Sequence, residues 1–350
     1  MATTESQPAP DLEPWQEPVR GGPSDFAALR LPGLEQVRAA ADGRLQKSSI
    51  LRLTGGRLAS VERGRVGAVL PASPWLAGPR GALHPGALAV LADLALTGTA
   101  MTALPPGVLL TTAELSLTFL ADMPPPGGEL VADGRLVHAD SRHALASCEI
   151  RGPAGELLAH ASARTFTLSP VDVSGFGELG TPPPEPDWES PDPWARPLAT
   201  VDPVDPRTTT GAEVLAETAS GTRLRPPVDR LLGITARQIA QGDGPAPDVT
   251  FTMRASPWLG NEFGTVSGGA LVLLAKSATA AAGQAAARPG SPYRALDVKV
   301  NLLEPVPLDG RELVAVGRTR HVSKLTVATG EVRHNDALIA LATGSIVLGS

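Results

Sequence analysis

A four-residue sequence, Ser-Pro-Trp-Leu, occurs twice in this chain of 350 residues, at positions 73–76 and again at 256–259. The separation of 183 positions persists well beyond the match, so that His138 aligns with His321. This separation is too long for the repeating unit of a solenoid or a propeller. It indicates that a whole domain is present twice.

Composition supplies the boundaries of the two copies. Residues 1–24 combine acidic residues with prolines and lack an apolar segment, which is typical of a disordered lead and not of a signal peptide. Residues 169–206 are rich in Pro, Asp and Glu and predict an extended linker. The copies then occupy 25–168 and 207–350, each long enough for its own core.

Charge and composition exclude several classes of function. The formal net charge of −6 and the lack of Lys/Arg runs argue against a nucleic-acid partner. The most apolar stretch, 87–104, contains Asp93 and is too short to favour a membrane span. Cys148 is the only cysteine, so intrachain disulfides are excluded, and we interpret it as a small buried residue. The expected compartment is the cytoplasm.

Each copy carries the pattern of a long buried helix. Short helices are predicted at 33–43 and 211–221, each ending at its glycine. A β-prone segment follows in each copy. Longer helices are then predicted at 87–103 and 270–287, and both are apolar on nearly all sides. A helix without a polar face is a buried one.

Strands follow the long helix. Leu115, Leu117 and Phe119 alternate with polar residues, which is the period of a half-buried strand. Further strands are predicted in the first copy at 129–138, 144–151 and 157–168. One long buried helix followed by consecutive short strands predicts an α+β fold, in which an antiparallel sheet wraps around the helix.

Three segments carry a resemblance to a known family. They are NEFGTVSGGA at 261–270, LHPGA at 83–87 and TAELSLTFL at 112–120. With Asp93 inside the first long helix, they resemble the PaaI-like branch of the hotdog-fold thioesterases. The resemblance implies two tandem hotdog domains paired as a dimer within one chain, and hydrolysis of an acyl-CoA or acyl-carrier thioester.

In that family each active site is shared between two subunits. One supplies an Asn and a backbone N–H at the helix N-terminus, and the other supplies an acidic residue and a hydroxyl. Carried over by resemblance, the first site takes Asn261 and the Gly268 N–H from the second copy. It takes Asp93 and Thr112 from the first copy.

The second site lacks every one of these elements. The Asn position is Gly78, and the amide-donor position is Pro85, which has no N–H. The acid position is Lys276 and the hydroxyl position is Ala295. The losses all fall on one site, so we expect one live site and one degenerate site.

The chemistry of thioester hydrolysis suits the first site. Negative charge builds on the carbonyl oxygen, and a helix N-terminus offers free N–H donors and a favourable dipole. Gly268 and Gly269 let a substrate approach the backbone closely. Asp93 is the expected general base, and its apolar neighbours predict a raised pKa. Asn261 and Thr112 are expected to orient the carbonyl or the water.

The remaining binding residues are implied by position and resemblance. His84 lies at the start of the first long helix, and Arg142 and Lys324 follow matching strands as expected neighbours of CoA phosphates. His138 and His321 occupy matching positions, which favours a shared structural role. No P-loop, metal-ligand cluster or dinucleotide fingerprint appears, so we predict neither a cofactor nor a metal.

Two other functions remain open at this point. His84 lies nine residues before Asp93. Relatives with this fold that hydrate or dehydrate enoyl or hydroxyacyl thioesters rely on an active-site His or an Asp/His pair, so this reaction is an alternative. A non-catalytic acyl-thioester binder is the alternative from another class. The sequence leaves open which acyl group is bound and whether it is carried by CoA or by a carrier protein. It also leaves open whether the two copies pair within one chain or between two chains. A homodimer that forms a pseudo-tetramer is plausible.

Overall fold

Antiparallel strands dominate the chain. The computed structural model describes residues 12–198, 209–288 and 293–349. Within them, one sheet of 12 strands runs in the order β1-β2-β4-β5-β6-β3-β9-β12-β11-β10-β8-β7. The strands are β1 Arg57–Glu62, β2 Arg65–Pro71, β3 Leu110–Phe119, β4 Glu129–Ala139, β5 His143–Arg151, β6 Leu157–Thr167, β7 Thr235–Ala240, β8 Asp248–Arg254, β9 Tyr293–Leu302, β10 Glu312–His321, β11 Leu325–His334 and β12 Ala337–Leu348. The second half of the sheet repeats the first in reverse order.

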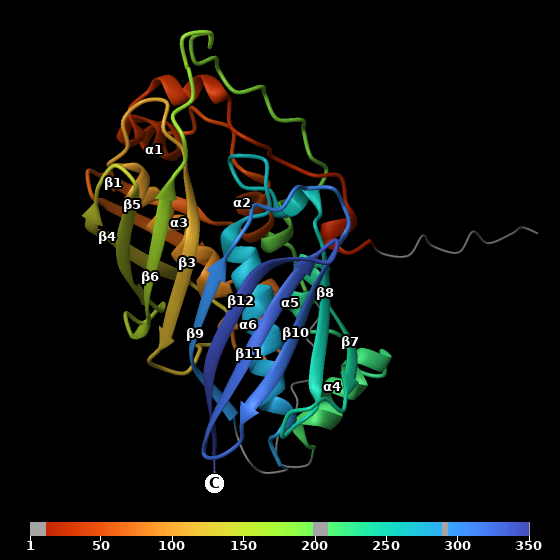
Figure 1. The fold of residues 1–350 in the computed structure, drawn as a ribbon. Coiled ribbons are helices and arrows are strands. Elements are labelled where there is room, and N and C mark those ends of the chain that lie inside the picture. The colour runs from red at the N-terminus through yellow and green to blue at the C-terminus, as the bar shows by residue number, and fades with distance from the viewer. Residues whose placement is uncertain (1–11, 199–208, 289–292, 350) are drawn as a thin grey trace, which may run out of the picture.

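The two halves join where β3 pairs with β9 (Figure 1). In that ladder Ser116 pairs with Lys299, its own counterpart at the separation of 183. A position that pairs with its own counterpart lies on a twofold axis, so the copies are related by an internal pseudo-twofold. The predicted pairing of two copies within one chain is confirmed.

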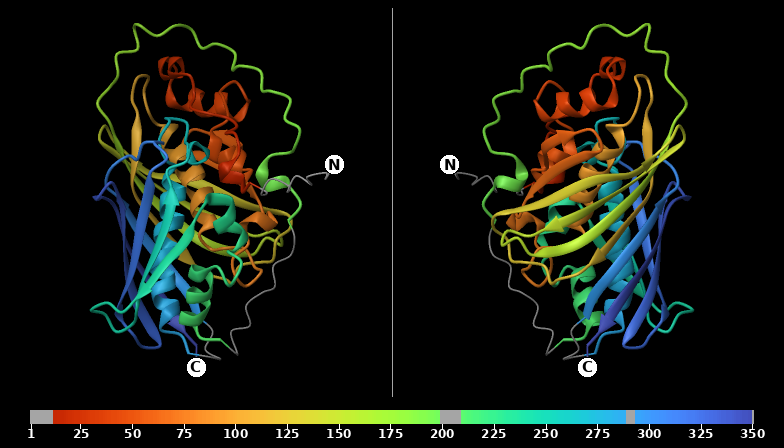
Figure 2. Two further views of the ribbon diagram at one scale, coloured as in Figure 1. Left: turned by 90° about the vertical axis from the view of Figure 1, so that its right-hand side faces the viewer. Right: turned by 90° about the vertical axis from the view of Figure 1, so that its left-hand side faces the viewer.

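Each half of the sheet wraps around one long helix (Figure 2). The helices are α1 Gly33–Ala41, α2 Ser49–Thr54, α3 Ala87–Met101, α4 Gly211–Ser220, α5 Pro227–Leu232 and α6 Gly268–Ala285. The long helices α3 and α6 are buried along most of their length, as their lack of a polar face predicted. Cys148 is also buried, with 2% of its surface exposed, and burial raises the pKa of its thiol to about 12.

The helices α3 and α6 cross at a glycine. A Cβ added to Gly269 would lie 2.7 Å from the Cα of Val90 and 2.9 Å from the carbonyl oxygen of Ala89. No other side chain fits at that distance, so this contact requires glycine. Asp93 lies one turn after Val90 and therefore faces the first turn of α6.

Two Pro-Trp segments hold the copies together from outside the sheet. Residues Pro14–Gln16 and Pro193–Ala195 each form a short 3-10 helix, called η1 and η4. The first precedes copy one but packs on copy two, where the Trp258 Nε1–H donates to the carbonyl oxygen of Glu17 at 2.9 Å. The second precedes copy two but packs on copy one, where the Trp75 Nε1–H donates to the carbonyl oxygen of Arg196 at 3.1 Å.

The described part of the lead, residues 12–24, packs as one arm on copy two, and the linker runs without helix or strand until Pro193–Ala195 packs as the other arm on copy one. Indole rings supply the physical reason. A Cβ on Gly233 would lie 2.8 Å from the ring of Trp15, and a Cβ on Gly55 would lie 2.7 Å from the ring of Trp194. An ion pair between Glu17 and Arg196 joins the two arms. Residues 1–11 of the lead and 199–206 of the linker lie outside the described residues.

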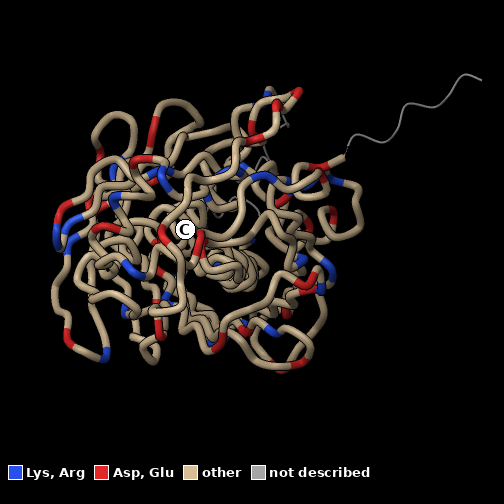
Figure 3. The backbone as a smooth tube through the Cα atoms, turned by 90° about the horizontal axis from the view of Figure 1, so that it is seen from above, with Lys and Arg blue, Asp and Glu red and all other residues tan. Residues whose placement is uncertain are grey.

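Figure 3 shows acidic and basic residues interspersed along the chain. Among the described residues, no helix is both long and apolar enough to cross a membrane.

Replacing Trp194 tests the role of the arms. We expect Trp194→Ala to lower the free energy of unfolding by about 2–3 kcal/mol, since the indole covers Gly55 and holds the linker on copy one. Urea unfolding measures the change. Trp188→Ala is the matched control, because Trp188 is 36% exposed and we expect a loss below about 1 kcal/mol. Equal losses in both variants would contradict a role specific to the arm.

Candidate active site

A cavity of about 980 Å³ opens where the two copies meet. Its walls come from α1, α3 and β3 of copy one, from the loop before α6 of copy two, and from the linker. Asp93, Thr112, Asn261 and Gly268 all line it. The four residues that resemblance assigned to the first site are therefore brought together at one cavity.

Asp93 bridges the two copies. Its Oδ2 accepts the backbone N–H of Gly269 at 2.8 Å and the hydroxyl of Ser267 at 3.3 Å, both in copy two. This contact follows from the close crossing at Gly269 and Val90. A carboxylate at a helix N-terminus is stabilised by the free N–H groups and by the helix dipole.

Two threonines of copy one complete the surroundings of this carboxylate. The hydroxyls of Thr97 and Thr112 donate to Asp93 Oδ1 at 3.2 and 3.5 Å, and they lie 3.3 Å from each other. Thr97 is one helical turn after Asp93 on α3, and Thr112 comes from β3. Sequence reasoning missed Thr97 and Ser267. The i, i+4 spacing of Asp93 and Thr97 was the available signal for Thr97.

The pKa of Asp93 is raised above its usual value of 3.8 because burial disfavours the charged form. The hydrogen bonds from Gly269, Thr97, Ser267 and Thr112 oppose that shift without cancelling it. A raised pKa at a carboxylate that lines a cavity is typical of a general base.

Glu262 is a second carboxyl group at this cavity that sequence reasoning did not single out. Burial raises its pKa, and the nearby charge of Asp93 adds to the increase. The two acids therefore compete for protons.

The helix N-terminus leaves one donor free. The Gly269 N–H is used by Asp93, but among the described residues the Gly268 N–H has no hydrogen-bond partner. Gly268 lines the cavity, and its ideal Cβ position lies 3.2 Å from both carboxylate oxygens of Asp93. This N–H can receive negative charge that develops close to Asp93.

Asn261 shapes the loop that leads to this donor. Its Oδ1 accepts the N–H groups of Phe263 and Thr265, both at 3.0 Å, and its Nδ2 donates to the Thr265 hydroxyl at 3.0 Å. The carboxamide lines the cavity but holds the turn through three hydrogen bonds. Its observed contacts are those of a turn former.

The comparisons with known proteins agree with this architecture. Residues 80–159 match the family model described as the thioesterase superfamily. A tesB protein of Mycobacterium avium subspecies paratuberculosis covers 91% of this chain and 100% of its own at 14% identity, with a TM-score of 0.53. A protein of unknown function with a hot dog fold from Alicyclobacillus acidocaldarius covers 87% and 99% at 15% identity, with a TM-score of 0.51. The chain is a tandem hotdog protein.

A third solved structure is similar over a comparable length. The acyl-CoA thioesterase II TesB2 of Mycobacterium marinum covers 86% of this chain and 96% of its own at 12% identity, with a TM-score of 0.51. At such identities the likeness establishes the fold. No curated protein sequence matches the chain.

The position in copy two that corresponds to Asp93 is occupied by a residue of opposite charge. Lys276 stands where Asp93 stands in the first site, with 6% of its surface exposed. Among the described residues it has neither a hydrogen bond nor an ion pair. The pKa of its amine is lowered to about 7, mainly by burial and to a smaller extent by the charge of Arg80. Burial raises the pKa of nearby Asp229, also to about 7.

His84 lies at this second position and not beside Asp93. Its Nδ1 accepts the N–H of Gly86 at 3.2 Å. Burial, followed by the charge of Lys276, lowers the pKa of its imidazole well below 6.5. His84 is not among the residues that line the cavity. The expectation that His84 binds substrate at the Asp93 site is therefore corrected, because the loop before α3 faces α6.

The cations expected to meet CoA phosphates also lie elsewhere. Arg142 is in the β4–β5 turn and Lys324 is in the β10–β11 turn, and neither lines the cavity. Lys47, Arg52 and Arg57 do line it. Burial, followed by the charge of Arg52, lowers the pKa of Lys47. These cations come from α2 and its flanks in copy one, where the sequence offered no motif.

The raised pKa of Asp93 makes a prediction about stability. The charge of Asp93 destabilises the folded state at pH values above the folded-state pKa of this group. The destabilisation is absent below the pKa of Asp93 in the unfolded chain, which is near 3.8. We expect Asp93→Asn to increase the free energy of unfolding at pH 7, with a gain that shrinks as the pH falls towards 4. Urea titrations at several pH values measure it. Asp122→Asn is the control, since Asp122 is 90% exposed. A gain independent of pH would contradict the assignment.

Proposed function

We propose that this tandem hotdog protein hydrolyses an acyl thioester, acyl-CoA or acyl-carrier, at the cavity between its copies. One observation carries the proposal: the carboxylate of Asp93 reaches from copy one to the N-terminus of α6 in copy two, beside the free N–H of Gly268. The match of residues 80–159 to the thioesterase superfamily supports this class of reaction.

In this mechanism the thioester carbonyl oxygen lies at the N-terminus of α6. The Gly268 N–H donates to that oxygen as it becomes negative, and the helix dipole adds to the stabilisation. A donor of this kind lowers the barrier by about 3 kcal/mol. Asn261 contributes by holding the loop that positions Gly268.

Asp93 acts as the general base. It takes a proton from a water molecule as the water oxygen bonds to the carbonyl carbon, which gives a tetrahedral intermediate. The C–S bond then breaks, the carbonyl reforms, and the proton held by Asp93 passes to the departing thiolate. The hydroxyls of Thr97 and Thr112 position the carboxylate and the water.

The lining of the cavity divides the substrate into two parts. Apolar side chains of α1 and α3, among them Val37, Leu94 and Met101, surround the space for the acyl group. Lys47 and Arg52 lie where α2 and the linker close the cavity, and we assign them to the phosphates of CoA. Arg52 already pairs with two linker carboxylates, Asp192 at 3.2 Å and Glu185. A substrate phosphate then replaces one of these partners.

The second, pseudo-symmetric position is proposed to be inactive in hydrolysis. Lys276 offers no carboxylate base, and Pro85 offers no N–H at the position of Gly268. His84 lies near Lys276 and not beside Asp93. The hypothesis of a hydratase therefore lacks the His/Asp pair on which it depended. A non-catalytic binder remains as an outcome of the experiment below.

Hydrolysis by three variants tests the catalytic assignment. We expect Asp93→Asn to lower kcat by about 10²–10⁴-fold on an acyl-CoA panel, because it removes the general base. Glu262→Gln and Lys276→Met are the matched controls, with changes of only a few-fold. Steady-state release of free CoA measures all four proteins.

Two other results would change the assignment of the base or of the function. Loss of activity in Glu262→Gln but not in Asp93→Asn would move the base to Glu262. Binding of acyl-CoA without turnover by the wild-type chain would replace the enzyme by a binder.

The phosphate assignment makes a separate prediction. Arg52→Ala is expected to raise KM for an acyl-CoA about tenfold while leaving KM for the same acyl group on N-acetylcysteamine unchanged, because only CoA carries the phosphates. Arg142→Ala, outside the cavity, is the control and should alter neither. An equal change with both substrates would point to structural damage or to a role in positioning the linker.

A further inference from the structure

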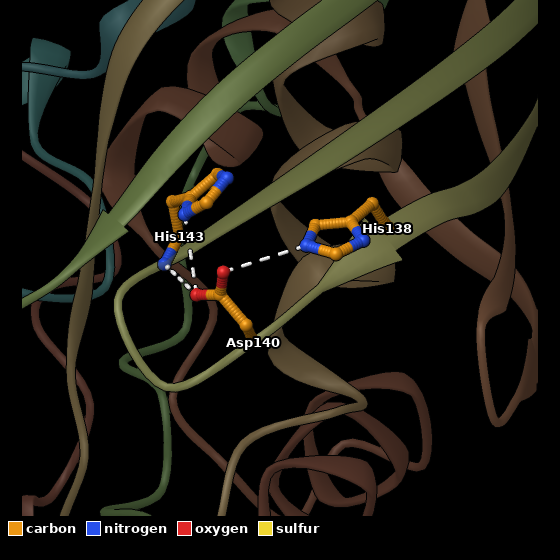
Figure 4. Close-up of side chains that lie close together, drawn as sticks. All are labelled: His138, Asp140 and His143. Atoms are coloured by element: carbon orange, nitrogen blue, oxygen red, sulfur yellow. Dashed lines mark hydrogen bonds and ion pairs between the residues drawn. The ribbon is translucent and has the colours of Figure 1, made fainter.

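Three side chains that bind metals well meet at the turn between β4 and β5 (Figure 4). His138 is near the end of β4, Asp140 is in the turn, and His143 begins β5. The His138 Nε2 lies 3.4 Å from Asp140 Oδ2, and the His143 Nδ1 lies 3.2 Å from Asp140 Oδ1. One ligand atom from each of the three lies within 4.8 Å of the others. Sequence reasoning, which found no metal cluster, missed this spacing.

The backbone of the turn fixes the carboxylate. Asp140 Oδ1 accepts the N–H groups of Arg142 at 2.7 Å and His143 at 3.0 Å. The register of β4 with β5 shifts between Leu136 and His138. The turn therefore already holds the carboxylate between the two imidazoles, so little side-chain entropy is lost when an ion binds.

The distances suit a small divalent ion. Zn²⁺ binds imidazole nitrogen and carboxylate oxygen at about 2.0–2.2 Å, so two ligands of a tetrahedral site lie roughly 3.3 Å apart. Each imidazole lies at about that spacing from one carboxylate oxygen of Asp140, His138 at 3.4 Å from Oδ2 and His143 at 3.2 Å from Oδ1. A set of two imidazoles and one carboxylate suits Zn²⁺ and its first-row neighbours. The ligands are partly exposed, so water can complete the coordination.

We propose that His138, Asp140 and His143 form a binding site for a first-row divalent cation, Zn²⁺ in particular. Three protein ligands hold the ion and leave at least one position to solvent. The site is separate from the proposed chemistry at Asp93. It still borders the cavity, since the ring of Phe166, a cavity-lining residue, lies 6.3 Å from that of His143. A bound ion would hold His143 against that wall.

The second copy supplies an internal comparison. His321 aligns with His138 in the repeat, but Ser323 and Thr326 stand at the positions of Asp140 and His143. The equivalent turn of copy two therefore lacks two of the three ligands. The inferred site belongs to copy one alone, in contrast to the shared structural role expected from the alignment of the two histidines.

Calorimetric titration of the full chain with ZnCl₂, after treatment with a chelator, tests the proposal. We expect one saturable site per chain. His138→Ala, Asp140→Asn and His143→Ala should each weaken binding at least tenfold, whereas His321→Ala, the matched control, should leave it unchanged. Thermal unfolding without metal, alike in all variants, establishes that each one folds.

Further measurements separate the outcomes. Co²⁺ bound at this site should give visible absorption bands that disappear in His143→Ala. No saturable binding by the wild-type chain would overturn the proposal. Binding that survives His138→Ala and His143→Ala but is lost in His334→Ala would overturn it as well, since His334 faces Asp309 at 3.1 Å and would then be the site.

Discussion

The close crossing of α3 and α6 at Gly269 is the contact on which the proposed site depends. Only a glycine allows the backbone of α6 to reach Val90, and this approach places Asp93 against the N–H of Gly269. The carboxylate then occupies part of the helix N-terminus and leaves the Gly268 N–H to the cavity. The proposed base and the proposed oxyanion donor come from different copies, so neither copy holds the proposed site alone.

Much of this arrangement could be predicted from the sequence because it rests on local patterns and on the repeat. The apolar helices follow from their lack of a polar face, and the pairing of copies follows from the fixed separation. Comparison of Asp93 with Lys276, and of Gly268 with Pro85, predicted two unequal sites from the sequence. That step needed the resemblance to the hotdog-fold thioesterases, which supplied the site positions, and the assumption that one copy faces the other.

What the sequence did not predict depends on contacts between distant segments. Trp15 and Trp194 stand in matching Pro-Trp pairs, yet their separation of 179 differs from 183, and acidic, proline-rich surroundings favoured disorder. His84 was paired with Asp93 by nearness in the chain, whereas the crossing turns it towards Lys276. The cations of the cavity come from α2 and its flanks, which carry no recognisable motif. Tertiary packing decides each of these cases.

A single composite site is proposed to serve the whole chain. Calorimetric titration with a non-hydrolysable thioether analogue of an acyl-CoA tests it most directly. The predicted result is one equivalent bound per chain, with affinity sharply reduced when Gly268→Pro removes the free N–H and unchanged in Lys276→Met. Two equivalents per chain, or affinity lost in Lys276→Met and kept in Gly268→Pro, would contradict it.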